Sequence, residues 1–356
     1  MNRITINKIN IGVDYPPYIV AEMSANHNGN IDNAFKIIER AKKAGANAIK
    51  IQTYTADTIT IESDLPDFKI NDGLWKGKTL YDLYESAHTP WDWHKELFDY
   101  AKKLNITLFS SPFDKSAVDL LEDLNTPAYK VASFEIVDIP LIKYIASTKK
   151  PIIISTGMAN EIEIEEAVTA CRDSGCNEIA LLHCVSGYPA KVSDYNLKTI
   201  SDIKNRHNLV VGISDHTLSN ITSVSSISHG ASIIEKHFTL DRMAGGPDDS
   251  FSLEPNELKD LCDTAYIAWT AQGQVDYSKK SSEIENIKFR RSLYFIQDIK
   301  KGDKIKEEHV KSIRPGFGMK PKFLKSIIGL VASRDIYKGT PVKEKYLLDF
   351  KNKINK

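Results

Sequence analysis

The chain has 356 residues, and its 47 Lys and Arg residues balance its 47 Asp and Glu residues. A neutral chain lacks the overall positive field that draws proteins to nucleic acid or anionic membranes, so we expect neither as a partner. No apolar run is long enough to span a membrane, and the N-terminus lacks the apolar part of a signal peptide, which predicts a cytoplasmic protein. The four cysteines show no paired metal-ligand spacing and are expected to be free thiols.

Eight short apolar runs end in polar residues and alternate with segments of helical periodicity. The runs are rich in Ile, Val and Ala with little alternation, as in parallel strands buried on both faces. Eight such units predict a (β/α)8 TIM barrel, whose active site lies at the C-terminal ends of the strands. The predicted strands are 18–23, 46–52, 107–111, 129–133, 151–155, 180–184, 209–214 and 232–237.

Helices are expected between these strands. In the first of them, Ala34, Ile37 and Ile38 fall on one apolar stripe, and Gly45 follows as the stop signal. The predicted helices are 31–44, 91–104, 115–124, 139–147, 161–174, 196–208, 220–230 and 254–271.

The chain is longer than a single barrel requires. We assign residues 1–272 to the barrel, 273–288 to a polar linker and 289–356 to a small C-terminal domain. Two similar pieces recur in that domain, at 298–305 and 335–342, and each predicts two short strands around a glycine turn. So small a domain has a marginal core, and we expect it to cap a site rather than carry chemistry alone.

The connection after the second strand is much longer than the other connections between a strand and its helix. It runs from residue 54 to residue 91 and is rich in aromatic residues between 73 and 84. A long loop at the catalytic end of a barrel typically forms a lid or a wall that selects the substrate. The alternative is an accessory hairpin that only packs on the barrel.

Three lysines, Lys50, Lys130 and Lys236, lie at strand ends that face one mouth. Ammonium groups with hydroxyl donors predict a phosphate site, because a buried dianion needs compensation. The alternative is that the lysines pair with Glu135 and Glu235. The flanking hydroxyls belong to Thr53, Ser111, Ser133, Ser155, Ser186 and Ser214.

Two histidines, His216 and His237, follow the seventh strand and end the eighth. Two imidazoles with oxygen ligands from water or substrate suit Mn²⁺, Co²⁺ or Zn²⁺, and suit Mg²⁺ less well. His27 is a third candidate ligand, or it orients the first loop. Four carboxylates could act as the base, accept hydrogen bonds from sugar hydroxyls, or hold the metal ligands in position. They are Glu22, Glu135, Asp215 and Asp248.

A metal that polarises a carbonyl, next to a phosphate cradle, favours the addition of a phosphorylated enol to an aldehyde. The mechanistic alternative is a metal-independent Schiff-base aldolase that uses Lys130 as its amine.

Ten stretches of the chain resemble the sialic acid synthase family. Residues 290–294 (RRSLY) and 313–316 (IRPG) resemble its C-terminal antifreeze-like (SAF) domain. The resemblance implies an α/β fold with a TIM barrel and a SAF domain. The other stretches are 21–29 (AEMSANHNG), 50–53 (KIQT), 110–114 (SSPFD), 130–135 (KVASFE), 155–158 (STGM), 182–189 (LHCVSGYP), 212–217 (GISDHT) and 235–239 (EKHFT).

Within the family, the stretches 22–27, 73–84, 89–94 and 132–140 look closest to the pseudaminic acid synthases. The implied reaction condenses phosphoenolpyruvate with the open-chain aldehyde of 2,4-diacetamido-2,4,6-trideoxy-altrose, with C–O cleavage and release of phosphate. The alternatives are the same chemistry on an N-acetylneuraminate or legionaminate precursor, and an ice-binding protein without enzymatic activity. The 73–94 stretch is expected to supply an apolar wall for the 6-deoxy sugar, with Trp75 and Tyr81 as candidates.

The resemblance also implies a role for each motif residue. Those that would hold phosphoenolpyruvate are Lys50, Ser111, Lys130, Ser133, Ser155, Ser186 and Ser214. Those that would hold a divalent metal (Mn²⁺, Co²⁺ or Mg²⁺) are His216 and His237. Those that would contact the amino sugar or the attacking water are Glu22, Glu135 and Asp248, with Tyr188 beside them. Arg314 would reach the partner's mouth in a domain-swapped homodimer and contact an N-acetyl group.

Overall fold

The structure is a computed structural model that describes residues 3–351. The chain separates into two compact units, Met1–Gly273 and Gln274–Lys356. Residues 1–2 and 352–356, which the sequence analysis assigns to the barrel and to the C-terminal domain, lie outside the described residues. In the part that is described, no helix combines the length and apolar character needed to cross a membrane.

Eight parallel strands of the first unit close into a barrel in the order β10-β3-β4-β5-β6-β7-β8-β9. The predicted TIM barrel is therefore confirmed. Because all eight run the same way, their C-terminal ends meet at one end of the barrel. The strands are β3 Tyr18–Glu22, β4 Ala48–Thr53, β5 Thr107–Pro112, β6 Tyr129–Val131, β7 Ile152–Ser155, β8 Ile179–Cys184, β9 Val210–Ser214 and β10 Ala231–His237.

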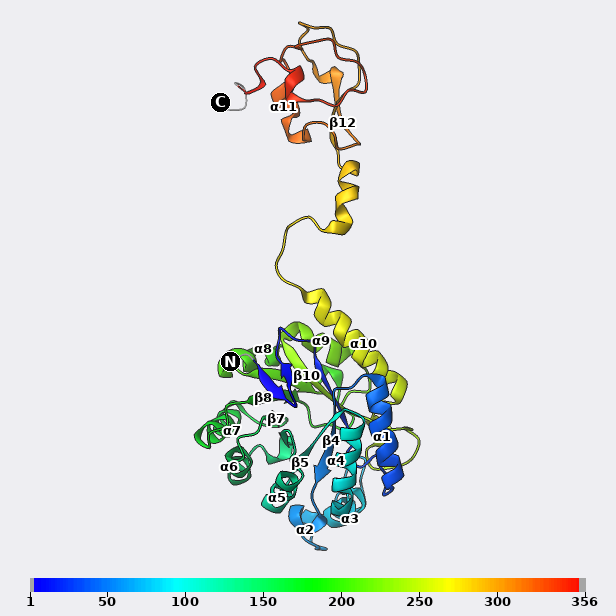
Figure 1. Ribbon diagram of the computed structural model, residues 1–356, viewed down its shortest axis with the longest axis vertical. Helices are drawn as coiled ribbons and strands as arrows, with labels where there is room; N and C mark the ends of the chain where they lie inside the picture. The colour runs from blue at the N-terminus through cyan, green and yellow to red at the C-terminus, as the bar shows by residue number, and fades with distance from the viewer. Residues whose placement is uncertain (1–2, 352–356) are drawn as a thin grey trace. The chain divides into compact units, whose positions relative to one another are not determined.

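Helices surround the barrel (Figure 1). The first shows why the sequence forms them: the Asn30 side chain accepts from the backbone N–H of Asp32, and Gly45 ends the helix at φ 102°. Its apolar stripe, which includes Ala34, Ile37 and Ile38, is buried against the strands. The helices are α1 Ile31–Ala44, α4 His94–Lys103, α5 Lys115–Asp123, α6 Ile139–Ser147, α7 Glu161–Asp173, α8 Lys198–His207, α9 Ile221–Ser226 and α10 Pro255–Gln272.

An antiparallel hairpin precedes the barrel and does not follow from the sequence analysis. It pairs β1 Ile4–Ile6 with β2 Ile9–Ile11 through a turn at Asn7 and Lys8, which both have positive φ. Its buried isoleucines pack with residues of the barrel interior such as Phe109. The hairpin therefore closes the N-terminal end of the barrel.

The long connection after β4 contains two helices, α2 Ala56–Ile59 and α3 Leu80–Ala87. In Figure 1 they lie at the end of the barrel opposite the hairpin. The connection therefore belongs to the end where the strands finish, as expected for a loop at the active face.

The second unit contains one two-stranded sheet, β11 Ser292–Phe295 with β12 Val310–Ile313, and the short helix α11 Leu324–Ile327. The recurring pieces at 298–305 and 335–342 do not form the pairs of strands that we predict. They pair with each other through a single bridge between Ile299 and Ile336, because each piece is too short to build its own ladder. The segment predicted as a linker includes the 3-10 helix Ser281–Phe289.

Candidate active site

The barrel brings four charged side chains, two lysines and two glutamates, together at its C-terminal end. Glu22 of β3 lies opposite both Lys50 of β4 and His237 of β10. Lys50 Nζ lies 3.1 Å from Glu22 Oε2 and 3.5 Å from Glu235 Oε1. Lys130 Nζ, from β6, lies 3.1 Å from the same Glu235 oxygen. The two lysines thus face the mouth as predicted, and they also pair with Glu235 as the alternative interpretation held.

Burial and charge set the protonation of this cluster in opposite directions. Burial raises the pKa of Glu235, but Lys130 and Lys50 outweigh it and bring the value to about 2. Burial raises the pKa of Glu22 to about 7, although Lys50 opposes the shift. Burial also lowers the pKa of Lys130, although Glu235 opposes the shift. When both amines are protonated, they outnumber the one firmly ionised carboxylate, and the positive charge suits an anionic ligand.

The predicted hydroxyls line the same region, except that of Thr53. Thr53 Oγ1 instead lies 2.8 Å from His94 Nε2 and 2.6 Å from Ser110 Oγ. Ser111 Oγ accepts from Lys50 Nζ at 3.4 Å, and Ser214 Oγ donates to Glu235 Oε1 at 3.1 Å. Ser155, at the end of β7, is buried, and within residues 3–351 its hydroxyl has no hydrogen-bond partner. An unpaired buried hydroxyl is available to a ligand.

Two further serines converge on a glycine. Gly157 N–H donates to Ser133 Oγ at 3.1 Å. A Cβ on Gly157 would lie 2.7 Å from Ser133 Oγ and 2.3 Å from Ser186 Oγ. Because residue 157 has no side chain, the hydroxyls of Ser133 and Ser186 can both lie next to the Gly157 backbone.

The two histidines lie side by side, with ring centroids 5.4 Å apart. His216 Nδ1 lies 3.0 Å from the Val185 carbonyl oxygen, and since a carbonyl only accepts, Nδ1 carries the proton and Nε2 is left as a ligand atom. His237 Nδ1 is buried and has no hydrogen-bond partner in the described residues. Burial, with His216 adding to it, lowers the pKa of His237 well below its usual value, so its ring is neutral.

A neutral imidazole is the form that binds a metal. Burial lowers the pKa of His216, but Cys184 outweighs it and leaves the pKa raised, so a divalent ion on this pair would displace a proton from that ring. The Asp248 carboxylate lies 3.9 Å from His237 Nδ1. Within the described residues, no group of three or more His, Cys, Asp or Glu side chains is arranged to hold a metal ion. An ion on these histidines would therefore complete its shell with water or substrate oxygens.

The remaining predicted site residues in the barrel lie around this pair. Tyr188 stacks on His216 with ring centroids 4.4 Å apart. Glu135 Oε2 is buried without a hydrogen-bond partner in the described part of the chain, and burial raises the pKa of this carboxyl to about 7. Burial also raises the pKa of Asp248. Arg314 follows β12 in the second unit, and its predicted reach into a partner remains a prediction.

Besides Thr53, three residues considered from the sequence do not face the mouth. Lys236 Nζ is bound to Asp215 Oδ2 at 3.1 Å and to the Thr217 carbonyl at 2.6 Å. The expectation that Lys236 joins the anion site is therefore wrong, and Asp215, whose role the sequence leaves open, is the partner of Lys236. His27 Nδ1 accepts from Gly29 N–H at 3.1 Å, so this ring orients the first loop. The physical reason for Lys236 is the alternation of β10, in which its neighbours on either side take the inner face.

Sequence reasoning considered Glu235 only as an alternative partner of the lysines, and it missed Gly157 as the cradle for the hydroxyls. The signal for Glu235 was present, because it is two residues before His237 and therefore shares its face of β10. No pattern in the sequence points to the role of Gly157. The buried thiol of Cys184, whose Sγ lies 4.0 Å from Ser186 Oγ, was also not anticipated beside the site.

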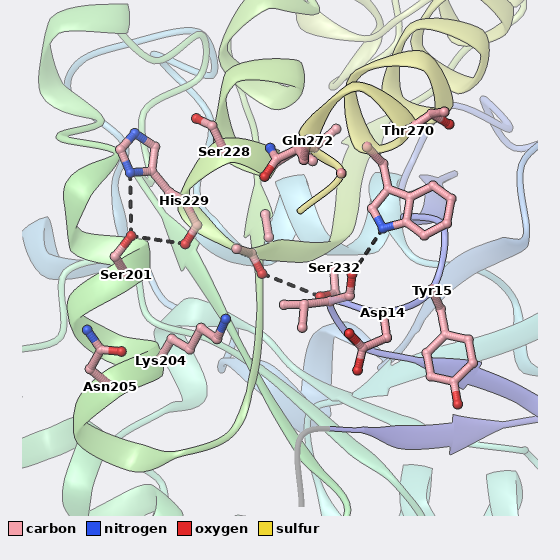
Figure 2. A pocket seen from close by; sticks show the side chains of 16 residues that line it. Asp14, Tyr15, Ser201, Lys204, Asn205, Ser228, His229, Ser232, Thr270 and Gln272 are labelled. Carbon is pink, nitrogen blue, oxygen red and sulfur yellow. Dashed lines mark hydrogen bonds between the residues drawn. The ribbon is translucent and has the colours of Figure 1, made fainter. Parts of the chain in front are cut away.

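A separate cavity of about 750 Å³ lies at the N-terminal end of the barrel (Figure 2). Asp14, Tyr15, Lys204 and His229 are among the residues that line it, and Ser201 Oγ donates to the His229 carbonyl there. None of the predicted site residues lines it. The candidate active site therefore lies at the opposite, C-terminal end of the barrel and not in this cavity.

Comparison with known proteins agrees with this geometry. Residues 37–277 match the NeuB family and residues 290–348 match the SAF domain. Pseudaminic acid synthase of Campylobacter jejuni is 44% identical over 94% of this chain and 98% of its own length, and that of Helicobacter pylori is 42% identical over 92% and 96%. The crystal structure of N-acetylneuraminic acid synthetase from Leptospira borgpetersenii superposes with a TM-score of 0.71 at 32% identity, over 81% of this chain and 96% of that one. The resemblance found in the sequence is confirmed, and the chain belongs to the NeuB family of sialic acid synthases.

Proposed function

We propose that this enzyme is a pseudaminic acid synthase, which joins phosphoenolpyruvate to open-chain 2,4-diacetamido-2,4,6-trideoxy-altrose and releases phosphate. The observation that carries the proposal is the 44% identity to a pseudaminic acid synthase over nearly all of both chains. The N,N'-diacetyllegionaminic acid synthase of Campylobacter jejuni is less similar, at 37%.

In this proposal the mouth divides into a phosphate half and a sugar half. Lys50 and Lys130 bind the anionic groups of phosphoenolpyruvate, because charge-assisted hydrogen bonds are the strong ones in a site this buried. The hydroxyls that complete this half are Ser111, Ser133, Ser155, Ser186 and Ser214. The ligand shares the two lysines with Glu235, which keeps them in place when the site is empty.

The sugar half is formed by the histidines and the carboxylates. His216 and His237 hold a divalent metal, Mn²⁺, Co²⁺ or Mg²⁺, which when bound polarises the aldehyde and stabilises the developing alkoxide. Glu22, Glu135 and Asp248 contact the sugar or the attacking water, and carboxyls whose pKa lies near 7 can both accept and donate a proton at neutral pH. Tyr188 lies beside them.

The bonds change as follows. C3 of phosphoenolpyruvate bonds to the aldehyde carbon, whose oxygen takes a proton and becomes a hydroxyl. Water adds to C2, and the bond from C2 to the bridging oxygen breaks. The oxygen from water becomes the C2 carbonyl oxygen, and phosphate leaves with the bridging oxygen. A protonated carboxyl supplies the proton that the aldehyde oxygen takes. One of the two water protons restores that carboxyl, and the other leaves with phosphate.

We also propose a cytoplasmic, domain-swapped homodimer in which Arg314 of one subunit contacts an N-acetyl group at the other subunit's mouth. Phosphoenolpyruvate is a cytoplasmic metabolite, which supports the location. Exposed apolar side chains on the loops after β6, β7 and β8 and in the first turn of α7 support a partner at this end of the barrel, because such patches mark interaction sites. They are Phe134, Val137, Met158, Ile162 and Val192.

The test is phosphate release from phosphoenolpyruvate with Mn²⁺, run on the diacetamido-altrose sugar and on N-acetylmannosamine, each with and without chelator. We expect release only with the first sugar and only with metal. Release only with N-acetylmannosamine would overturn the substrate, and activity that survives chelation, with borohydride trapping on Lys130, would establish the Schiff-base alternative. Phosphoenolpyruvate labelled with ¹⁸O in its bridging oxygen should give labelled phosphate.

A further inference from the structure

The long loop after β4 is joined across the mouth to the loop after β10 by one side chain. Trp75 Nε1 donates a hydrogen bond to the Pro247 carbonyl oxygen at 3.0 Å. Pro247 directly precedes Asp248, whose carboxylate lies beside His237. The position of Trp75 is therefore coupled to the backbone that carries a residue of the sugar half.

Trp75 also touches the ring of Tyr188, which comes from a third loop. The two ring centroids lie 5.7 Å apart, and the Tyr188 ring further contacts His216 at 4.4 Å and Phe251 at 5.3 Å. Within residues 3–351 no hydrogen bond orients the Tyr188 hydroxyl. Because ring packing alone places this side chain, removing Trp75 leaves one side of it uncovered.

We propose that Trp75 is a positioning residue of this active site, which latches the loop after β4 to the loop after β10 and holds the Tyr188 ring against His216. It acts through other residues rather than on the reacting atoms. Among the described residues, no hydrogen bond or ring contact joins it to Lys50 or Lys130, so we expect its effect to fall on the sugar half and to spare the phosphate half. The part of this inference that concerns the sugar rests on the proposed function.

The same connection provides a matched control in Tyr81. Its hydroxyl donates to Asp57 Oδ1 at 3.3 Å at an exposed position on α3, and it makes no ring contact with Tyr188. The sequence treats Trp75 and Tyr81 as equal candidates for a wall against the sugar. The contacts separate them, and only Trp75 reaches the cluster of rings.

The first experiment needs no substrate. Lys76 and Lys78 follow Trp75 closely and are trypsin sites, so limited proteolysis of the full chain reports how often this loop opens. We expect W75A to be cleaved there about tenfold faster than wild type, since it loses a hydrogen bond and ring contacts. W75F, which keeps a ring but lacks the N–H, should fall between, and Y81F should match wild type. Equal cleavage of wild type and W75A would overturn the latch.

The second experiment measures the effect on each substrate. W75A should raise the sugar KM and lower kcat, together by about tenfold or more in kcat/KM, with W75F again intermediate. The KM for phosphoenolpyruvate and the melting temperature should stay near wild-type values. A loss that affects both substrates equally would overturn the assignment to the sugar half.

A double-mutant cycle completes the test. Because Trp75 acts through Tyr188, W75A should cost much less in a Y188A background than in wild type. Additive losses would overturn the coupling. Wild-type enzyme that does not use the diacetamido sugar would refute the proposed function, and the protease comparison would still decide the latch.

Discussion

Lys130 and Lys236 show how the same residue type serves two purposes a short distance apart. Each is only 2% exposed. Lys130 Nζ points into the mouth beside Glu235, whereas Lys236 Nζ is held by Asp215 and backbone carbonyls outside it. The first is placed to meet a ligand, and the second joins β10 to the loop after β9.

Substitution by methionine should therefore have different effects at the two positions. K130M should raise the KM for phosphoenolpyruvate by about ten- to a hundredfold, the worth of a hydrogen bond to a charged group. K236M should leave that KM unchanged but cost about 3–5 kcal/mol in the free energy of unfolding, since Asp215 is left buried and uncompensated. Steady-state kinetics and urea titration measure the two. The double variant D215N/K236M should recover much of the stability, and a K236M enzyme as stable as wild type would contradict the role of this pair.

Glu135 lowers the stability of the folded protein by an amount that depends on pH. Burial raises the pKa of this carboxyl from 4.5 to about 7. Since the pKa is higher in the folded state, the protonated carboxyl is fully compatible with folding below pH 4.5, and stability is lost as the pH rises through 7. Glutamine does not titrate, so E135Q should gain more in melting temperature over wild type at pH 8 than at pH 5, while its kcat falls. A melting-temperature difference that is constant with pH would contradict this.

At the scale of the element, the turn after β7 is built around one missing side chain. G157A would push a methyl group onto the hydroxyls of Ser133 and Ser186. Because both belong to the proposed phosphate half, we expect the KM for phosphoenolpyruvate to rise by about tenfold or more, with the sugar KM changed little. Inhibition by inorganic phosphate should weaken in parallel. G157A kinetics equal to wild type would show that these hydroxyls do not bind the phosphate.

Much of this architecture follows from the sequence, because buried parallel strands leave long runs of Ile and Val that alternate with amphipathic helices. The hairpin of β1 and β2 could not be predicted from the sequence, because strands of three residues are too short to show a hydrophobic periodicity. In the second unit, the pieces at 298–305 and 335–342 pair across the fold through Ile299 and Ile336, a contact that no local pattern encodes.

The site, too, contains features that local sequence patterns predict and features that depend on contacts between distant segments. The polar ends of the strands predict which residues can gather in one mouth, and Lys50, Lys130, His216 and His237 do gather there. Applying the two-residue period of a strand to 232–237 would have excluded Lys236 and included Glu235. The link from Trp75 to Pro247 spans 172 residues and depends on how three loops fold over the mouth, which local periodicity cannot describe.

At the scale of the whole molecule, the neutral net charge hides a strong division. Residues 274–356 contain 21 Lys and Arg residues and 10 Asp and Glu residues, whereas the rest contains 26 and 37. The second unit is thus cationic and the barrel unit anionic by the same amount. Such complementarity favours the proposed exchange of second units between two chains.

This division predicts an association that depends on salt. Raising NaCl from about 0.05 M to about 0.5 M shortens the Debye length severalfold, so the dimer dissociation constant should rise by about tenfold or more in analytical ultracentrifugation. A chain that ends at Gly273 should sediment as a monomer. A dissociation constant indifferent to salt would show that apolar contacts alone hold the dimer.

The hairpin of β1 and β2 has a consequence for how ligands reach the site. Ile4, Ile6 and Ile11 pack against residues of the barrel interior, so the N-terminal end of the barrel is closed and the strand ends are accessible from one side only. In the proposed function, both substrates must then use that side. We therefore expect ordered kinetics, with phosphoenolpyruvate binding before the sugar and phosphate leaving last, and product-inhibition patterns measure this order.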